Sequence, residues 1–325
     1  MKRLLLIFFA FFILSLSGCG KGRADSGVPR DSLSSSEKIS VVTTIFPPYD
    51  FVRQVAGDRA ELTMLLPPGT ESHSYEPSPQ DIITIQESDI FICVGGESDV
   101  WVKEILNSMD RDSMKIIPLM STVEAAEEEF VEGMEGGHES EGSHDIDKEA
   151  EYDEHVWTSP LNSIKIVNSI TEALCSADSA NSDYYAQSAR EYITELSRLD
   201  EQLRQVTNSA KRNTLIFGDR FPFRYLADEY GLEYYAAFPG CSTETEASAA
   251  TVAFLIDKVS EESIPSVFHI ELSNEKMAGT ISEATGAKKL LLHSCHNLTK
   301  DDFESGATYV SLMEQNIENL KEALN

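Results

Sequence analysis

Four of the seven histidines stand in loops that directly precede or follow regular elements predicted from the sequence. His73 follows a predicted strand, His155 follows an acidic stretch, and His293 and His296 follow the last predicted strand. Loops at the ends of regular elements often carry binding side chains. Neutral imidazole is a common ligand of zinc and of other first-row metals. A single loop histidine is more often solvated, but separate placements of this kind favour a metal site.

Other metal and catalytic motifs are weak or missing in the sequence. The five cysteines include no Cys-x-x-Cys pair, which argues against a cysteine zinc cluster. Neither His-Glu-x-x-His nor Gly-x-Ser-x-Gly occurs, so a secreted zinc hydrolase is the weaker alternative and we expect no enzyme. Cys241 and Cys295 lie in loop sequence, where a disulfide and two free thiols are equal alternatives.

The charge balance excludes one class of partner. Lys and Arg number 26 against 55 Asp and Glu, which gives a formal net charge of -29. Nucleic-acid binding depends on clustered Lys and Arg that contact phosphates, so we expect no nucleic-acid partner. An acidic surface favours solubility and attracts cations weakly.

The first residues have the pattern of an export signal. Two cations precede an apolar run from Leu4 to Leu14, which is about half the length of a membrane-spanning helix. We therefore predict a signal peptide over 1–18. The small residues before Cys19 resemble a bacterial lipobox, which implies cleavage there and acylation of the thiol. Residues 19–38 are predicted to be a lipid-anchored flexible tether, so the protein should be extracytoplasmic and attached to the bacterial cell membrane.

Short apolar runs alternate with stretches of helical periodicity on both sides of one long helix. Strands are predicted at Ile39–Ile45, Leu62–Leu66, Ile90–Val94, Lys115–Pro118, Thr214–Phe217, Leu232–Ala236, Ser266–Glu271 and Lys289–Leu292. Between the two sets, Asp183–Ser209 contains no Gly or Pro and predicts a helix about 40 Å long. This alternation predicts an α/β fold in which two lobes with parallel sheets are bridged by one long helix. A ligand would then bind between the lobes, at the carboxyl ends of the strands.

The predicted organisation has three parts after the tether. An N-terminal α/β lobe covers 39–182, the bridging helix 183–210 and a C-terminal α/β lobe 211–325. Within the first lobe, the stretch 124–154 is rich in acidic residues and glycine and includes two further histidines. Its low hydrophobicity and high charge predict a mobile loop that buries no core.

Several of these features occur together in one known family. They are the acidic insertion, the segment Asp153–Pro160, the ending Gly306–Met313, and the motif of His73 with Tyr75, Pro77, Ser78 and Asp81. In this combination the chain resembles the zinc and manganese solute-binding lipoproteins of ABC importers, and among them the zinc-type, ZnuA-like proteins. The resemblance extends from about Ile39 to the C-terminus.

The resemblance implies a function and its partners. The protein would be the substrate-binding component of an ABC importer, a monomer that holds zinc between its lobes and delivers it to a membrane permease and its ATPase. Manganese-type or iron-type binding proteins and metal-dependent adhesins of the same fold are the alternatives. A nitrogen-rich ligand set favours zinc, whereas manganese accepts more oxygen ligands in octahedral geometry.

The resemblance also implies ligands. His73 and His155 would be ligands from the first lobe. His293 stands where the family's last ligand, usually an aspartate, occurs.

The third ligand of the family, a His or a Glu, falls on Arg220 in this chain. Arginine stays protonated and cannot ligate a cation, so this ligand must be replaced. Asp219 is the nearest candidate, and His296 and Glu271 are the alternatives. We expect Arg220 to pair with an acidic neighbour such as Glu271.

Overall fold

The structure is a computed structural model that describes residues 38–71, 75–96, 99–109, 114–135, 151–242 and 246–325. By contact density, Lys38–Asn325 form one compact unit. The predicted signal peptide, tether and acylated Cys19 lie outside the described residues. Within the described ranges, no helix is both long enough and apolar enough to span a membrane.

The first lobe contains a sheet of four parallel strands in the order β2-β1-β3-β4. Every residue of β3 is buried, as expected for a parallel sheet covered on both faces. The strands are β1 (Ile39–Thr43), β2 (Ala60–Met64), β3 (Ile90–Cys93) and β4 (Lys115–Pro118). The helices of this lobe are α1 (Phe46–Ala56), α2 (Pro79–Gln86), α3 (Val100–Ser108) and α4 (Pro160–Ala177).

The second lobe repeats this arrangement with four parallel strands in the order β6-β5-β7-β8. Its strands are β5 (Thr214–Phe221), β6 (Glu233–Pro239), β7 (Ser266–His269) and β8 (Lys288–Leu291). Its helices are α6 (Arg224–Tyr230), α7 (Ala249–Glu261), α8 (Lys276–Thr285), α9 (Lys300–Glu304) and α10 (Tyr309–Leu324). The predicted α/β fold with two parallel sheets is therefore confirmed.

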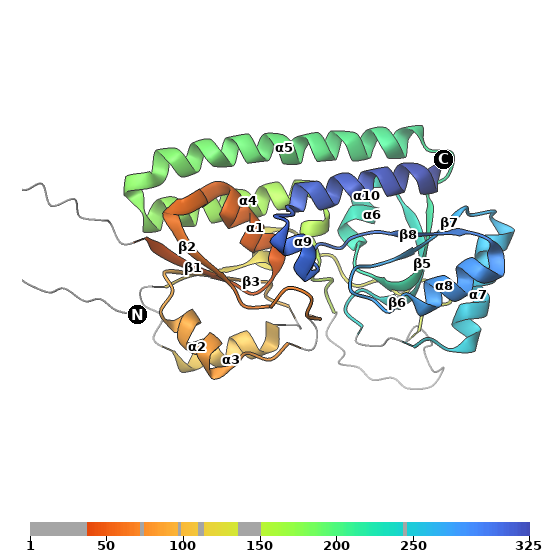
Figure 1. Cartoon of the computed structure of the whole chain (residues 1–325), viewed down its shortest axis with the longest axis horizontal. Helices are drawn as coiled ribbons and strands as arrows, with labels where there is room; N and C mark the ends of the chain where they lie inside the picture. The colour runs from red at the N-terminus through yellow and green to blue at the C-terminus, as the bar shows by residue number, and fades with distance from the viewer. Residues whose placement is uncertain (1–37, 72–74, 97–98, 110–113, 136–150, 243–245) are drawn as a thin grey trace, which may run out of the picture. The chain divides into compact units, whose positions relative to one another are not determined.

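The long helix α5 (Ser182–Ser209) packs against α1 and α4 of the first lobe and against α6 and α10 (Figure 1). Its buried residues recur every three or four positions, which places them on one face of the helix. They are Tyr185, Ala189, Tyr192, Leu196, Leu199, Leu203 and Val206. The bridging helix predicted from the sequence is thus confirmed, and one continuous apolar stripe holds it to both lobes.

The N-terminal ends of α1 and α2 are set by residues that do not line the site. α1 begins at Phe46, directly before Pro47 and Pro48, because proline is well tolerated in the first turn of a helix. At α2, Ser78 and Asp81 form a capping box, and the hydroxyl of Tyr75 donates to Asp81 Oδ2 at 3.1 Å. Tyr75, Ser78 and Asp81 therefore fix the chain after the His73 loop.

The stretch 124–154 differs from the mobile loop that the sequence predicted. Residues 136–150, with both extra histidines, lie outside the described residues, but the two flanks are ordered. Glu127 pairs with Tyr152 in an isolated antiparallel bridge, and Glu129 forms an ion pair with Arg224. The acidic side chains of the first flank thus find cationic and N–H partners in the second lobe. The side chain of Met134 is buried in the main hydrophobic cluster, so the prediction that this stretch buries no core is wrong for its first flank.

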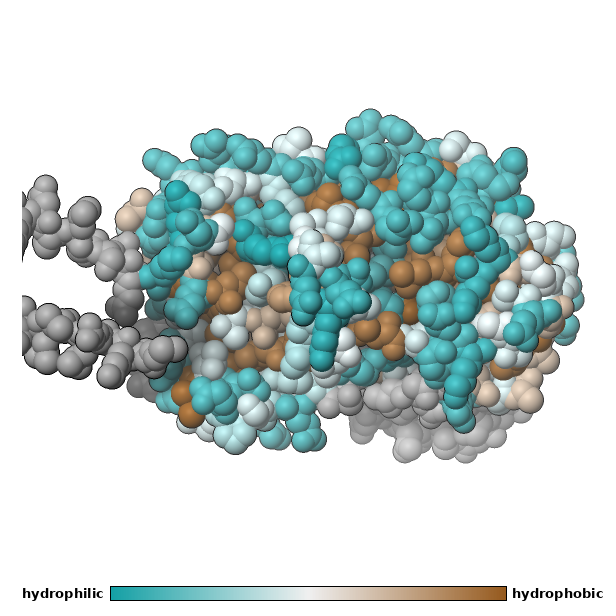
Figure 2. All heavy atoms as spheres, viewed as in Figure 1, coloured by the Kyte–Doolittle hydropathy of each residue, from teal (hydrophilic) through white to brown (hydrophobic). Residues whose placement is uncertain are grey.

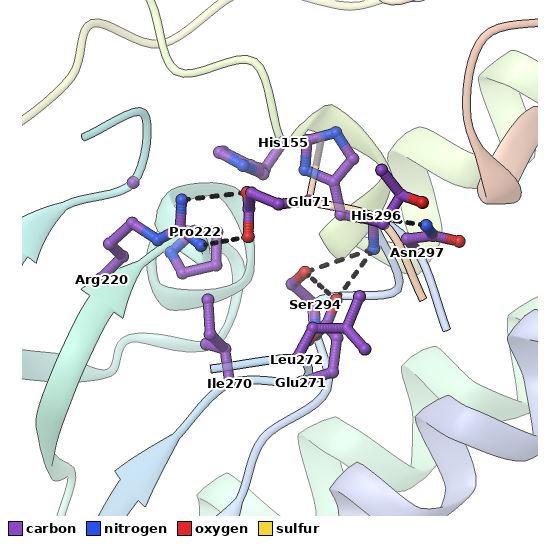
Figure 3. A pocket seen from close by; sticks show the side chains of 12 residues that line it. Glu71, His155, Arg220, Pro222, Ile270, Glu271, Leu272, Ser294, His296 and Asn297 are labelled. Atoms are coloured by element: carbon purple, nitrogen blue, oxygen red, sulfur yellow. Dashed lines mark hydrogen bonds and ion pairs between the residues drawn. The ribbon is translucent and has the colours of Figure 1, made fainter. Parts of the chain in front are cut away.

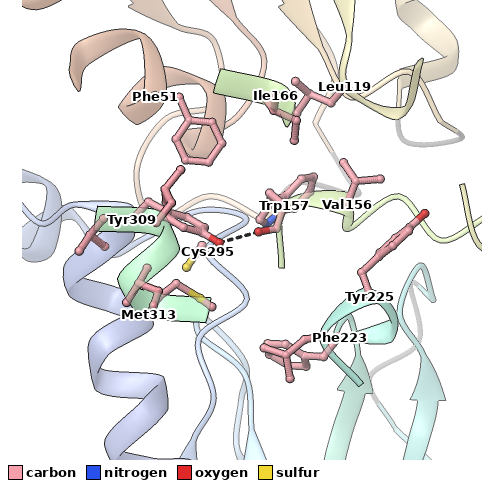
Figure 4. Close-up of a cluster of buried hydrophobic side chains, with 14 of the residues drawn as sticks. Phe51, Leu119, Val156, Trp157, Ile166, Phe223, Tyr225, Cys295, Tyr309 and Met313 are labelled. Atoms are coloured by element: carbon pink, nitrogen blue, oxygen red, sulfur yellow. Dashed lines mark hydrogen bonds between the residues drawn. The ribbon is translucent and has the colours of Figure 1, made fainter. Parts of the chain in front are cut away.

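One hydrophobic cluster extends through both lobes (Figure 4). Trp157, in the short helix η4 (Val156–Thr158), is fully buried in it, and its indole N–H donates to the carbonyl of Ser294 at 2.8 Å. The hydroxyl of Tyr309 donates to the carbonyl of Trp157 at 2.7 Å. A large apolar contact of this kind limits relative motion of the lobes.

The face shown in Figure 2 is mostly polar. On the face shown in Figure 2, hydrophilic residues predominate and hydrophobic ones are visible mainly in the depressions between them. This distribution agrees with the strongly negative net charge of the chain. Buried polar side chains are therefore more informative about a specific site than exposed ones.

Candidate metal-binding site

The ends of several strands meet at one small pocket lined by both lobes (Figure 3). The pocket lies where a ligand is expected in open α/β sheets, at the carboxyl ends of the strands. It encloses about 20 Å³, which is room for a single ion or water but not for a chelate. Its lining includes Thr70, Glu71 and His155 from the first lobe and Arg220, Glu271 and His296 from the second.

His155 is held by the residue two positions before it. The Asp153 carboxylate accepts from the backbone N–H of His155 at 2.8 Å and lies 3.1 Å from its Nδ1. Because a carboxylate only accepts, Nδ1 carries the proton and Nε2 presents a lone pair, the arrangement that carboxylates impose on metal-binding histidines. Burial works against a charge on this ring, but Asp153 outweighs it and the pKa of His155 is raised.

His296 brings a second imidazole to the pocket from the other lobe. Its ring centroid lies 5.3 Å from that of His155 and 5.0 Å from that of Trp157. Its backbone N–H donates to Glu271 Oε1 and to Ser294 Oγ, both at 3.2 Å. The sequence had offered His296 only as an alternative ligand.

His293, the preferred candidate from the sequence, does not line this pocket. Its backbone N–H and carbonyl are both bound by the amide of Asn316 in α10, each at 2.7 Å. Its Nδ1 accepts from the backbone N–H of Cys295 at 2.9 Å, and the ring is buried. Cys295, between the two histidines, has a left-handed backbone with φ 61°, and this turn together with the hydrogen bonds of Asn316 separates the two rings.

Glu271 holds the loop that presents His296. Its carboxylate accepts from the backbone N–H of Ser294 at 2.7 Å, from the Ser294 hydroxyl and from the backbone N–H of His296. Three donors from one loop already surround this carboxylate. Glu271 lines the pocket, and its hydrogen bonds make it a positioning residue for His296.

Asp219 lies in β5 and faces a different cavity. Its carboxylate accepts from the backbone N–H groups of Arg220 at 2.9 Å and Ile270 at 3.4 Å. Burial raises its pKa. Asp219 lines a neighbouring pocket of about 270 Å³, and the structure does not place it with His155 and His296.

Arg220 pairs with a carboxylate, but the partner differs from the one expected. Its guanidinium binds Glu71 through Nη2 to Oε2 at 3.1 Å and Nη1 to Oε1 at 3.3 Å, rather than Glu271. Glu71 is a residue that the sequence interpretation missed. Its position two residues before His73 was the available indication, because a ligand loop brings its neighbours to the same cavity.

The remaining candidates add no further ligand from the described residues. Cys241 and Cys295 are free thiols rather than a disulfide, and burial raises the pKa of both. A protonated thiol is a poor metal ligand. His73 lies outside the described residues, and among the described ones no group of three or more His, Cys, Asp and Glu is arranged to hold a metal.

Two α/β lobes bridged by a long helix, with imidazoles of both lobes in a buried pocket, define the class of two-lobed metal-binding solute-receptor folds. The model of the family described as zinc-uptake complex component A periplasmic, ZnuA, matches residues 41–323. The chain belongs to this family, whose members are solute-binding transport proteins.

Similar proteins agree with this assignment. The chain is 33% identical over 324 residues to the high-affinity zinc uptake system protein ZnuA of Bacillus subtilis, covering 98% of this chain and 97% of that protein. It is 32% identical over 325 residues to the zinc-binding lipoprotein AdcA of Streptococcus pneumoniae serotype 4, covering 99% of this chain but only 61% of AdcA. A solved structure, the Zn(II)-bound ZnuA-like domain of S. pneumoniae AdcA, superposes with a TM-score of 0.72 at 32% identity, covering 89% of this chain and 99% of that one.

Proposed function

We propose that this protein binds one zinc ion through His155 and His296 and delivers it to the permease and ATPase of an ABC importer. The observation that carries the proposal is the pair of buried imidazoles from different lobes with ring centroids 5.3 Å apart. A zinc–nitrogen bond of about 2 Å and a tetrahedral angle put the centroids of two ligating rings about 5 Å apart. The pair therefore already has the spacing that one zinc ion requires.

Relatives support the choice of metal. The two curated relatives described above are named for zinc binding or zinc uptake. An imidazole pair also suits zinc better than manganese. We propose His73 as the third ligand, since it follows the pocket residue Glu71 by two positions in the sequence. The protein then acts as a carrier rather than as an enzyme, as is typical of the solute-binding transport proteins of its family.

The test is a zinc titration of the metal-free protein by calorimetry. The wild type should bind one equivalent, and His155→Ala should bind at least tenfold more weakly, about 1.4 kcal/mol. His269→Ala is the matched control, because His269 lies in β7 and does not line the pocket. Equal affinity of His155→Ala and the wild type would refute the site. Manganese that displaces zinc at equal concentration would refute the metal.

We also propose that the mature protein is an extracytoplasmic monomer, held to the membrane by a lipid at Cys19. The support is the Leu-Ser-Gly-Cys sequence after the apolar run. Mass spectrometry of the protein isolated from membranes should find a diacylglyceryl group on an N-terminal Cys19, and Cys19→Ala should abolish membrane retention. An unmodified mature N-terminus beyond Cys19 would contradict the anchor.

A further inference from the structure

The ion pair of Arg220 and Glu71 joins the two lobes at the pocket itself. Both nitrogens at the end of the guanidinium face the carboxylate, at 3.1 and 3.3 Å, which is the planar two-point geometry that favours arginine over lysine (Figure 3). The Arg220 side chain is 11% exposed and that of Glu71 42% exposed. The guanidinium has a second acceptor, the carbonyl of Ser242 at 3.1 Å.

This pair stands between two cavities. Glu71, Arg220 and Leu272 line both the histidine pocket of about 20 Å³ and the neighbouring pocket of about 270 Å³ that contains Asp219. The Arg220–Glu71 pair therefore forms part of the wall that separates the large cavity from the two imidazoles. An ion that passes from one cavity to the other meets this pair.

The charges of the pair act on a cation in opposite directions. A fixed guanidinium beside a divalent ion is repulsive, and the repulsion is strong at a poorly hydrated site. Glu271 is surrounded by three donors of the His296 loop, whereas the Glu71 carboxylate is bound at two points by the guanidinium of Arg220, which is itself a cation. Glu71 is the carboxylate that can be transferred from one cation to another.

We propose that the Arg220–Glu71 pair is a latch that the incoming cation opens by taking the Glu71 carboxylate from Arg220 as an oxygen ligand. When the latch opens, Arg220 keeps its hydrogen bond to Ser242. When the cation leaves, Arg220 binds Glu71 again, so the arginine lowers the affinity for zinc and assists its release. This inference rests on the proposed zinc site and assigns a role to the residue that replaces a ligand in this chain.

Two variants that break the same pair should have opposite effects. Arg220→Gln removes the competitor of the metal, so zinc should bind at least tenfold more tightly. Glu71→Gln removes the proposed oxygen ligand, so zinc should bind at least tenfold more weakly. If the pair only connected the lobes, both variants would change the affinity in the same direction. Affinities are measured by competition with a fluorescent zinc chelator.

The controls separate the latch from the site. Arg224→Gln removes an equal charge from an interlobe pair with Glu129 that does not line the pocket, so zinc affinity should not change. Thermal unfolding of each variant without metal shows that it is folded. Cobalt(II) loaded in place of zinc should change its visible absorption in Glu71→Gln and keep it in Arg220→Gln.

The possible results distinguish a wrong latch from a wrong zinc site. Changes of the same sign in both variants, or an unchanged affinity in either one, would overturn the latch while leaving the zinc site in place. A wild type that binds no zinc would instead overturn the proposed function, and the latch would fall with it.

Discussion

The two histidines of the loop after β8 should have different roles, one in metal binding and the other in stability. The structure places His296 in the pocket and His293 in the core beside α10. We predict that His296→Ala mainly weakens zinc binding and that His293→Ala mainly lowers the free energy of unfolding. The two changes remove the same side chain from positions three residues apart, so each is a control for the other.

The magnitudes follow from the contacts. His296→Ala removes one nitrogen ligand, which should weaken zinc binding at least tenfold, or about 1.4 kcal/mol. In the metal-free protein it loses ring contacts with His155 and Trp157, which are worth about 0.5–1.5 kcal/mol each. His293→Ala leaves the buried N–H of Cys295 without its acceptor, which costs about 1–3 kcal/mol, and adds the loss of a buried ring.

Two measurements on each variant test these predicted roles. Zinc affinity is obtained by chelator competition, and the free energy of unfolding of the metal-free protein is obtained by urea titration. We expect His293→Ala to keep an affinity within about threefold of the wild type, on the reasoning that it is no ligand. A normal zinc affinity in His296→Ala, together with a loss of binding in His293→Ala, would refute the assignment of the second-lobe ligand.

Three further predictions concern Asp153, Asp99 and the segment 136–150. Asp153→Asn keeps an acceptor for His155 but removes the charge that raises its pKa, so zinc affinity should fall about 10-fold to 100-fold in chelator competition; an unchanged affinity would show that the charge has no role. Burial raises the pKa of Asp99 from 3.8 to about 6, so the folded state takes up a proton more readily than the unfolded one, and stability from this group is lost as pH rises from about 4 to about 7. That loss is worth up to about 3 kcal/mol in the free energy of unfolding. In urea titrations over this pH range, the free energy of unfolding of Asp99→Asn should therefore rise relative to that of the wild type. A difference between the two proteins that does not change with pH would contradict the reasoning. Deletion of 136–150 should leave one tight zinc equivalent in calorimetry, because the ligands proposed here lie outside that stretch; loss of the equivalent would place the site in the deleted segment.

Local sequence patterns were sufficient for the elements of the fold. β3 is an uninterrupted apolar run, and α5 is a long stretch without Gly or Pro that repeats apolar residues every three or four positions. Such patterns depend on neighbours in the chain, so strand and helix order and two parallel lobes could be predicted. His155 could be singled out because it follows the acidic stretch in the segment Asp153–Pro160, which carries part of the family resemblance. Its Asp153 partner, seen in the structure, is two residues away.

The prediction for the acidic flank was less accurate, because side chains from distant parts of the sequence hold it in place. The acidic flank before residue 136 was predicted to be mobile, yet Glu129 pairs with Arg224 nearly a hundred residues later. Its order depends on donors in the other lobe, which no local pattern contains.

The choice between His293 and His296 was decided by tertiary structure. Both follow the same strand, and their spacing in the sequence makes either one available. The left-handed backbone of Cys295 and the hydrogen bonds of Asn316 and Glu271 send one ring into the core and the other into the pocket. In the same way, Arg220 selects Glu71 over Glu271 because Glu271 is already surrounded by the donors of the His296 loop. The sequence by itself therefore determined the kinds of group at the site, whereas the partners were determined by contacts between segments that only folding brings together.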